Sequence, residues 1–399
     1  MPPNGCAWMN LFDSHGHPAN IPANCSFSVY APQWVYLLDG DLRAPDILRM
    51  IFRFPENPIL RPADVKPSRP DMEVACLLNP GAFVHNGRIG LLLRVAERPV
   101  QEDGFISTPV LDPEAPDGMR IVKSSTAERG QASDARLFVH EGQCYLTTLS
   151  HLRLAWSDDG VRFEVEPEPV LIGNGKLESF GIEDARVCCI DGVYNITYTA
   201  VSDAGYGVGL IRTKDWKTFD REGMIFPPPN KDCALFPEKI NGHYYALHRP
   251  THNDIGGPWI WISRSPDLLH WGAHQWIARP RPGWEAMKIG AGAEPIRTPR
   301  GWLEIYHAVD AKGEYSLGLL LLDLNDPTKV LARSTSPIMR PAEDYETAGF
   351  MQNVVFTNGH VVDGDTVTMY YGAADSVICG ARLSIAQMLE SLNALDSGE

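Results

Sequence analysis

A repeated alternation of turns and strands runs through most of the chain. A turn that contains glycine precedes an apolar, aromatic-rich segment at residues 85–95 (HNGRIGLLLRV), and the pattern recurs five times. Asn-Gly and Asp-Gly favour the tight turns of β-hairpins, while Val, Ile, Tyr and Thr favour strands. The six segments are 85–95, 140–150, 191–201, 241–250, 300–309 and 363–375, with turn glycines Gly87, Gly142, Gly192, Gly242, Gly301 and Gly364.

A second element follows several of these segments. Residues 154–163, 210–219 and 262–271 each contain an apolar strand, a polar turn with aspartate, and an aromatic residue. Each repeat of 50 to 63 residues therefore predicts about four short strands, the size of a propeller blade. Six turns predict five blades, with the ring closed by strands that the two ends of the chain share. The alternative is one or two β-sandwiches, which also have regular turns.

The two ends of the chain depart from the repeat. Residues 1–70 predict an N-terminal extension that packs on the propeller, with a short helix at 45–50 and an extended proline-rich crossing at 55–70. Residues 384–395 show apolar positions at helical spacing after Ser384, a suitable N-cap. We therefore predict an all-β fold: a five-bladed β-propeller of residues 71–399 with a short N-terminal extension and a C-terminal helix.

Composition excludes several classes of partner. The 399 residues carry a net charge of −15, which argues against nucleic-acid binding. No apolar run reaches the roughly 18 residues that span a bilayer, so no membrane association is expected. The eight cysteines form no C-x-x-C pair and the N-terminus lacks a signal sequence, which predicts reduced thiols and a cytoplasmic location. The scattered histidines predict no metal site.

Charged side chains interrupt strands that are otherwise apolar. Each has a structural interpretation by itself, because a buried charge can be paired with a neighbour. Together they come from every blade and are expected to meet at one mouth of the central channel, where propellers form pockets. These residues are Asn79, Arg94, Asp134, Arg136, Glu183, Asp184, Arg186, Lys231, Asp232, His248, Arg249, Lys288, Glu294, Arg297, His307 and Asp375.

Ordered motifs from about residue 70 onward resemble glycoside hydrolase family 130. They include NPGAF, GIEDARVCCIDGVYNITYTAV, NKDCALFPEKINGHYYALHRP, KIGAGAEPIRTPRGWLEIYHAV and VVDGDTVTMYYGAAD. The resemblance implies a five-bladed propeller and an inverting phosphorylase that cleaves β-mannosides with inorganic phosphate to give α-mannose 1-phosphate. It implies no cofactor besides phosphate as co-substrate. β-1,2-mannooligosaccharides are the favoured substrates, and β-1,4-linked ones remain open.

The resemblance also implies roles for individual residues. In the G-x-E-D-P-R motif, here with Ala185 in place of proline, Asp184 is the general acid, acting through a hydroxyl of the sugar. This role requires a raised pKa, which burial and the neighbouring Glu183 are expected to supply. Phosphate is expected to bind Lys231, Arg249, Lys288 and His307, and the sugar to contact Asn79, Arg94, Asp134, Glu183 and Asp375.

Two features keep other functions open. Residues 99–178 are predicted to be an insertion of nearly a full extra unit, and this insertion includes Asp134. Glu294 is expected to lie beside the phosphate site, where its carboxylate would be the base of a hydrolase. The alternatives are therefore an inverting β-1,2-mannosidase and a sugar-binding propeller without catalysis. Self-association into a homo-oligomer is left open.

Overall fold

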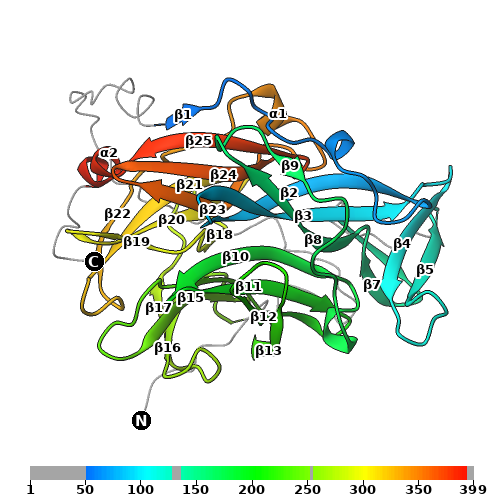
Figure 1. The fold of residues 1–399 in the computed structure, drawn as a ribbon, viewed down its shortest axis with the longest axis horizontal. Helices are drawn as coiled ribbons and strands as arrows, with labels where there is room; N and C mark the ends of the chain where they lie inside the picture. The colour runs from blue at the N-terminus through cyan, green and yellow to red at the C-terminus, as the bar shows by residue number, and fades with distance from the viewer. Residues whose placement is uncertain (1–50, 128–135, 252–254, 393–399) are drawn as a thin grey trace, which may run out of the picture. The chain divides into compact units, whose positions relative to one another are not determined.

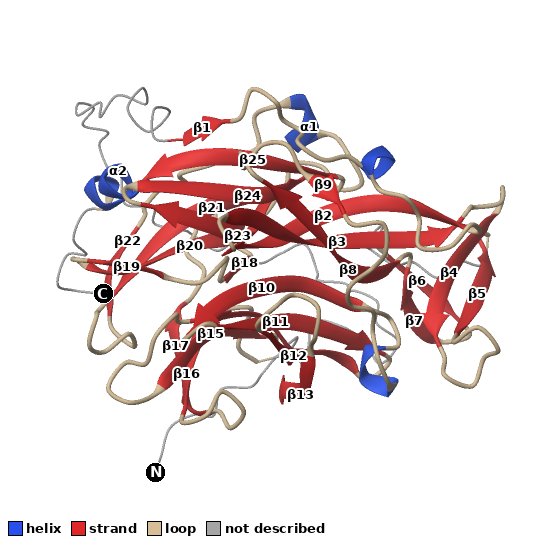
Figure 2. Ribbon diagram, in the orientation of Figure 1, coloured by secondary structure: helices blue, strands red, loops and turns tan. Residues whose placement is uncertain are grey.

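The structure, a computed structural model, describes residues 51–127, 136–251 and 255–392. Nearly all the regular structure in these ranges is strand (Figure 2). The α-helices there are α1 (Asp344–Thr347) and α2 (Ile385–Ser391), and two short 3₁₀ turns, η2 (Pro62–Asp64) and η3 (Lys176–Glu178), lie in loops. The predicted all-β class is therefore confirmed.

Five antiparallel sheets form the blades of a propeller (Figure 1). The first strands of blades 1, 2, 3 and 5 contact one another around the axis. Blade 1 contains β2 (Met72–His85), β3 (Arg88–Pro99), β8 (Leu149–Ser157) and β9 (Glu164–Val165); blade 2 contains β10 (Ile182–Ile190), β11 (Val193–Ser202), β12 (Gly205–Thr213) and β13 (Asp220–Phe226); blade 3 contains β14 (Asn230–Leu235), β15 (Tyr244–Pro250), β16 (Ile260–Ser265) and β17 (Gly272–Ala278). Blade 4 contains β18 (Lys288–Gly290), β19 (Ile296–Thr298), β20 (Gly301–Val309), β21 (Tyr315–Leu322) and β22 (Val330–Arg333); blade 5 contains β23 (Val355–Asp363), β24 (Thr366–Ala373), β25 (Val377–Ser384) and β1 (Ile51–Arg53).

The two ends of the described chain close the ring, as predicted. Strand β1 pairs antiparallel with β25 and becomes the outermost strand of blade 5. The boundary expected at residue 70 therefore differs from the structure, because residues 51–53 belong to the propeller itself. Residues 1–50, including the helix expected at 45–50, lie outside the described residues.

The hydrophobic core lies between the blades. Successive side chains of a strand point to opposite faces of the sheet, so each blade presents apolar residues to both neighbours. In β20, for example, Leu303 and Ile305 pack toward blade 5, whereas Trp302 and Tyr306 pack toward blade 3. Five separate apolar clusters fill the five interfaces between blades. This arrangement leaves the polar side chains of the inner strands at the axis.

The predicted aspartate turns recur as a structural unit in blades 1, 2 and 3. In blade 2, Thr213 Oγ1 accepts the amide hydrogen of Trp216 at 3.0 Å, and Asp215 accepts those of Lys217 and Thr218 at 2.9 and 2.8 Å. The turns at Ser157–Arg162 and Ser265–His270 make the same set of bonds. These bonds satisfy backbone donors in a turn and are a common role of Asp and Ser.

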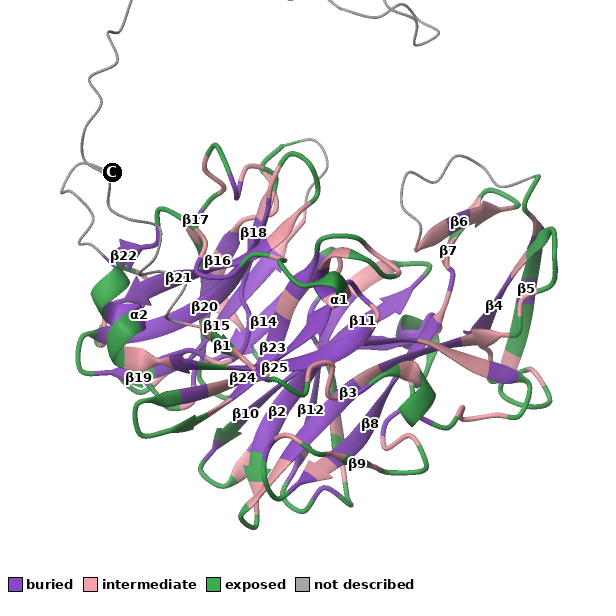
Figure 3. Cartoon of the chain, turned by 90° about the horizontal axis from the view of Figure 1, so that it is seen from above, coloured by how far each residue is buried: buried purple, intermediate pink, exposed green. Residues whose placement is uncertain are grey.

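The insertion expected at 99–178 is shorter than predicted, because β8 and β9 belong to blade 1. The inserted segment lies between β3 and β8 and contains two hairpins, β4 (Phe105–Leu111) with β5 (Met119–Ser125) and β6 (Leu137–His140) with β7 (Gln143–Leu146). Figures 1 and 3 show these hairpins at one side of the blades. The turn at Gly142 belongs to β6–β7, which explains why six similar turns accompany five blades.

The C-terminal helix is confirmed for its described part. Helix α2 begins after Ser384, whose side chain accepts the amide hydrogen of Gln387. Met388 and Leu389 pack into the apolar cluster between blades 4 and 5. Residues 393–395 of the predicted helix lie outside the described residues.

Candidate active site

Equivalent positions of successive blades supply the side chains of the site. In blades 1, 2 and 3 the inner strand bulges, so that two of its residues face one residue of the second strand. The first bulged residue is Asn79, Asp184 or Asp232, and both aspartates have a left-handed backbone, with φ of 51° and 54°. A bulge re-aims a side chain, and here three polar side chains turn toward the axis.

In blades 1 and 3, the second-strand residue that pairs with the residue before the bulge is an arginine. Leu78 pairs with Arg94 in blade 1, and Lys231 pairs with Arg249 in blade 3. In blade 4, where β18 ends, Gly290 pairs with His307. Residues far apart in sequence thus reach one mouth of the channel because they occupy the same place in the repeat.

These residues line a cavity of about 240 Å³. Its polar lining comes from blades 1 to 5 and from the inserted hairpins. All but one of the residues predicted to bind sugar or phosphate or to act as the acid contribute to it: Asn79, Arg94, Glu183, Asp184, Lys231, Arg249, Lys288, His307 and Asp375. The exception, Asp134, lies outside the described residues.

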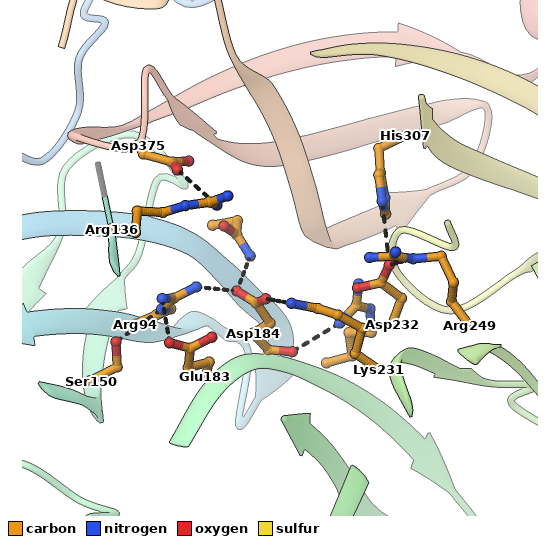
Figure 4. Close-up of polar contacts among 12 residues, drawn as sticks. Arg94, Arg136, Ser150, Glu183, Asp184, Lys231, Asp232, Arg249, His307 and Asp375 are labelled. Carbon is orange, nitrogen blue, oxygen red and sulfur yellow. Dashed lines mark hydrogen bonds and ion pairs between the residues drawn. The ribbon is translucent and has the colours of Figure 1, made fainter. Parts of the chain in front are cut away.

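Asp184 is buried at the centre of a hydrogen-bond network (Figure 4). Its Oδ1 accepts hydrogen bonds from Asn79 Nδ2 at 3.0 Å and from Arg94 Nη1 at 2.7 Å. Lys231 Nζ lies 3.9 Å from Oδ2. Arg94 also donates to Glu183 at 2.7 Å and to Ser150 at 3.0 Å, which fixes its guanidinium against both carboxylates.

The raised pKa expected for Asp184 is wrong. Burial alone would raise the pKa of Asp184, but the charges of Arg94 and Lys231 outweigh burial and hold it well below its usual value. The prediction considered burial and the carboxylate of Glu183 and omitted these two cations. Asp184 is therefore ionised until something changes the balance of charge around it.

Asp232 organises the opposite half of the pocket. Its Oδ2 accepts a hydrogen bond from Arg249 Nε at 2.5 Å, and its Oδ1 accepts one from Arg186 Nη2 at 3.4 Å. Arg186 also donates to the carbonyl oxygens of Asp184 and Gly292, at 2.9 and 2.6 Å. Arg249 therefore has a buried counterion within the protein.

Lys288 and His307 complete this half. Lys288 Nζ donates to the Tyr315 hydroxyl, and burial together with the charges of Arg249 and Lys231 lowers the pKa of Lys288 to about 7. Burial lowers the pKa of His307 to about 4, so at neutral pH its ring is a neutral hydrogen-bonding group. His307 is thus suited to donate one N–H and does not supply a positive charge in the ligand-free pocket.

Asp375 faces the inserted segment across the mouth. It lies in the turn between β24 and β25, and its Oδ2 is 3.7 Å from Arg136 Nη1 (Figure 4). Burial raises the pKa of Asp375, against the charges of Arg136 and Arg94. Arg136 precedes β6, so the inserted hairpins form part of the cavity wall.

Glu294 lies away from this cavity, and its assignment as a base beside the phosphate site is wrong. It is absent from the residues that line the cavity. The charge of Glu294 contributes to the raised pKa values of Cys188, Cys189 and Glu304. Burial raises the pKa of Glu294 itself to about 8. Its position in the GAGAEPI segment is close to Lys288 in sequence, but the chain turns between β18 and β19.

Sequence reasoning missed the apolar and aromatic wall of the cavity. Tyr206, Tyr315, Phe350 and Phe356 belong to it, together with Leu137 and Leu146 from the inserted hairpins. Their residue types are those of ordinary core positions, so no signal in a single sequence distinguishes them. His248 and Arg297, noted as polar interruptions, do not line the cavity.

The structure bears on the expectations about metal sites, membrane spans and cysteines only for the described residues. In the described ranges, no group of three or more His, Cys, Asp or Glu residues is arranged to hold a metal ion. The same ranges contain no helix long and apolar enough to cross a membrane. Their six cysteines are free thiols, and Cys6 and Cys25 lie outside them.

Comparison with known proteins places this geometry among characterised enzymes. A family model described as β-1,4-mannooligosaccharide phosphorylase matches residues 137–394. The chain is 42% identical over 348 residues to a β-1,2-mannobiose phosphorylase of Listeria innocua, covering 86% of this chain and 98% of the relative. It is 43% identical over 234 residues to a 1,2-β-oligomannan phosphorylase of Thermoanaerobacter sp., covering 58% of this chain and 77% of the relative. The structure of the Listeria innocua enzyme in complex with β-1,2-mannobiose superimposes with a TM-score of 0.83, covering 86% of this chain and 99% of that one.

Proposed function

The chain belongs to glycoside hydrolase family 130, and we propose that it is an inverting phosphorylase that cleaves β-mannosides with inorganic phosphate. The proposed substrates are β-1,2-mannooligosaccharides, because the relative matched over nearly its whole length is named for β-1,2-mannobiose. β-1,4-mannooligosaccharides, named in the family description, are the second choice. The products are α-mannose 1-phosphate and a mannoside shorter by one residue.

One observation carries the proposal: the cations Lys231, Arg249 and Lys288 line the same cavity as Asp184. Burial and the charges of Arg249 and Lys231 lower the pKa of Lys288, which supports an excess of positive charge on this side of the cavity. A phosphate dianion would relieve that excess through charge-assisted hydrogen bonds, each worth roughly 1.5–3 kcal/mol.

The reaction proceeds in one displacement. A phosphate oxygen attacks C1 of the terminal mannosyl residue while the bond from C1 to the leaving oxygen breaks. Asp184 supplies the proton that the leaving oxygen takes up, through a sugar hydroxyl, and is reprotonated from solvent. Inverting hydrolases need a second carboxylate to activate water, whereas phosphate is already an anionic nucleophile. A single direct attack inverts the anomeric centre and gives the α-phosphate.

Neither alternative function gains support from the site. A β-1,2-mannosidase would need a base, and Glu294, the candidate for that role, does not line the cavity. A binding propeller without catalysis would not need Asp184 in a cavity with three cations.

Product analysis tests the proposal. Purified protein is incubated with β-1,2-mannobiose, with and without inorganic phosphate, and the products are separated by anion-exchange chromatography. We expect α-mannose 1-phosphate and mannose to form in equal amounts only when phosphate is present. Release of free mannose alone, at a rate unaffected by phosphate, would establish a hydrolase instead. β-1,4-mannobiose in a parallel reaction determines the linkage.

A further inference from the structure

Asp232 places a buried negative charge beside the proposed phosphate site, where charge alone would oppose anion binding. Its side chain has no exposed surface, and it accepts hydrogen bonds from Arg249 and Arg186, while His307 Nε2 lies 3.3 Å from Oδ2. Burial would raise the pKa of Asp232, but the charges of Arg249 and Arg186 hold it well below its usual value. Asp232 is therefore ionised, and its presence needs a reason.

The bond to Arg249 suggests one. Within the part of the chain that the structure describes, the Arg249 side chain hydrogen-bonds through Nε, to Asp232. A guanidinium is planar, so a bond at Nε fixes the plane in which the two Nη groups lie. Those groups form the fork that binds two oxygens of a phosphate at once.

The surrounding backbone leaves space for this carboxylate. A Cβ atom added to Gly290 would lie 2.3 Å from Asp232 Oδ2 and 2.5 Å from His307 Cε1, so only glycine fits there. Through Arg186, Asp232 is also linked to the carbonyl oxygen of Asp184. One carboxylate thus contacts groups on both the phosphate side and the acid side of the cavity.

We propose that Asp232 is a positioning residue that orients Arg249 for the phosphoryl group of inorganic phosphate or of mannose 1-phosphate. The inference rests on the proposed function and deepens it. The alternative is that Asp232 is only a counterion. Its removal would then leave the cavity more positive, and phosphate would bind more tightly. If Asp232 orients Arg249, its removal weakens binding despite the gain in charge.

Measurements of equilibrium binding distinguish these two roles of Asp232 without relying on turnover. Inorganic phosphate and mannose 1-phosphate are titrated separately by calorimetry into the wild type, Asp232→Asn and the control Asp375→Asn, which removes a carboxylate of the same cavity that does not contact Arg249. We expect Asp232→Asn to raise the Kd of phosphate by about 10- to 100-fold, the usual effect of losing a group that orients a ligand-binding side chain. Asp375→Asn should leave it unchanged or lower it. Tighter phosphate binding by Asp232→Asn would overturn the proposal.

A second variant tests position without changing charge. Gly290→Ala displaces the Asp232 carboxylate while every ionised group remains, so phosphate binding should again weaken; an unchanged Kd would contradict the proposal. In the Arg249→Ala background, Asp232→Asn should have a much smaller effect than in the wild type. If the wild type binds phosphate but forms no mannose 1-phosphate, the proposed function fails while the binding test still decides the role of Asp232. If the wild type does not bind phosphate, both fail.

Discussion

The carboxyl group of Asp184 must carry a proton for the reaction proposed here, yet the charges of Arg94 and Lys231 favour its ionised form. In the proposed reaction, bound phosphate would supply the change of charge that protonation of Asp184 requires. A dianion beside Lys231 neutralises one of the charges that lower the pKa of Asp184, and it adds negative charge nearby, which raises that pKa. On this proposal, Asp184 would be protonated preferentially when phosphate is bound.

Replacing this acid should abolish turnover while preserving the fold. Asp184→Asn retains the shape of the side chain and removes the proton, so kcat for β-1,2-mannobiose should fall by about 10²- to 10⁴-fold, the usual contribution of a general acid. The matched control is Glu183→Gln, which removes the other carboxylate bound to Arg94. We expect a smaller loss there. Near-normal activity of Asp184→Asn would show that a different group donates the proton.

Lys288 should make phosphate use depend on pH. Its pKa of about 7 means that it is protonated at pH 6 and largely neutral at pH 8.5 in the free enzyme. Since the charged form binds phosphate, the KM for phosphate should rise as pH increases above about 7. Lys288→Arg remains charged throughout this range, and its KM should rise less. Parallel profiles for the two proteins between pH 6.5 and 9 would exclude Lys288 as the titrating group.

The polar part of the site could be predicted because its residues violate the apolar pattern of their strands. Asp184, Lys231 and Arg249 are conspicuous in the sequence for that reason. Their ionisation could not be predicted, because it depends on which charges the bulges bring within 4 Å. Asp232 was visible as a charge in a strand, but its contacts with Arg186 and Arg249 depend on three-dimensional geometry.

At the scale of elements, the inserted hairpins contribute side chains to the cavity wall. They lie outside the ladder of blade 1, between β3 and β8, and hold Arg136, Leu137 and Leu146 at the cavity. Their own core is small: Phe138 is fully buried and stacks on Tyr145, and the cluster extends to Phe180 of the segment before β10. The blades do not need this element for their own pairing.

Removing that core should therefore loosen the wall and spare the propeller. Phe138→Ala leaves a cavity that costs the hairpins about 3–5 kcal/mol. We expect faster hydrogen exchange confined to residues 100–148 and a KM for mannobiose raised severalfold, with the KM for phosphate less affected. The control is Phe105→Ala, a partly exposed aromatic residue of β4 in the same inserted segment. Unchanged KM and exchange in Phe138→Ala would show that the hairpins do not shape the mannoside site.

The repeat was predictable for a related reason. Turn glycines and aspartate turns occur in each blade because a four-stranded sheet needs the same turns each time, so their spacing revealed the fold. The hairpin at Gly142 uses the same turn chemistry for a different purpose, and no property of the sequence separates it from a blade turn. The extent of the insertion was therefore overestimated.

At the scale of the whole molecule, a three-residue strand and an ion pair contribute to ring closure. Strand β1 is short, but Arg53 within it donates to both oxygens of Glu346, at 2.7 and 3.0 Å, and to the carbonyl oxygen of Arg340. Glu346 is fully buried and also accepts a hydrogen bond from Tyr371. The pair joins the first described strand to the segment between blades 4 and 5.

Breaking this pair should destabilise the entire ring. Arg53→Ala leaves the Glu346 carboxylate buried without its cation, which costs about 3 kcal/mol for a pair that is mostly buried. The control is Arg88→Ala, whose partner Asp158 is exposed, so that pair contributes less than about 1 kcal/mol. We expect a melting temperature several degrees lower for Arg53→Ala and nearly unchanged for Arg88→Ala, measured by calorimetry at neutral pH. Because the loss arises from the stranded carboxylate, Arg53→Met combined with Glu346→Gln should recover much of it. Equal melting temperatures for the wild type and Arg53→Ala would mean that the blades hold the ring closed through their apolar interfaces alone.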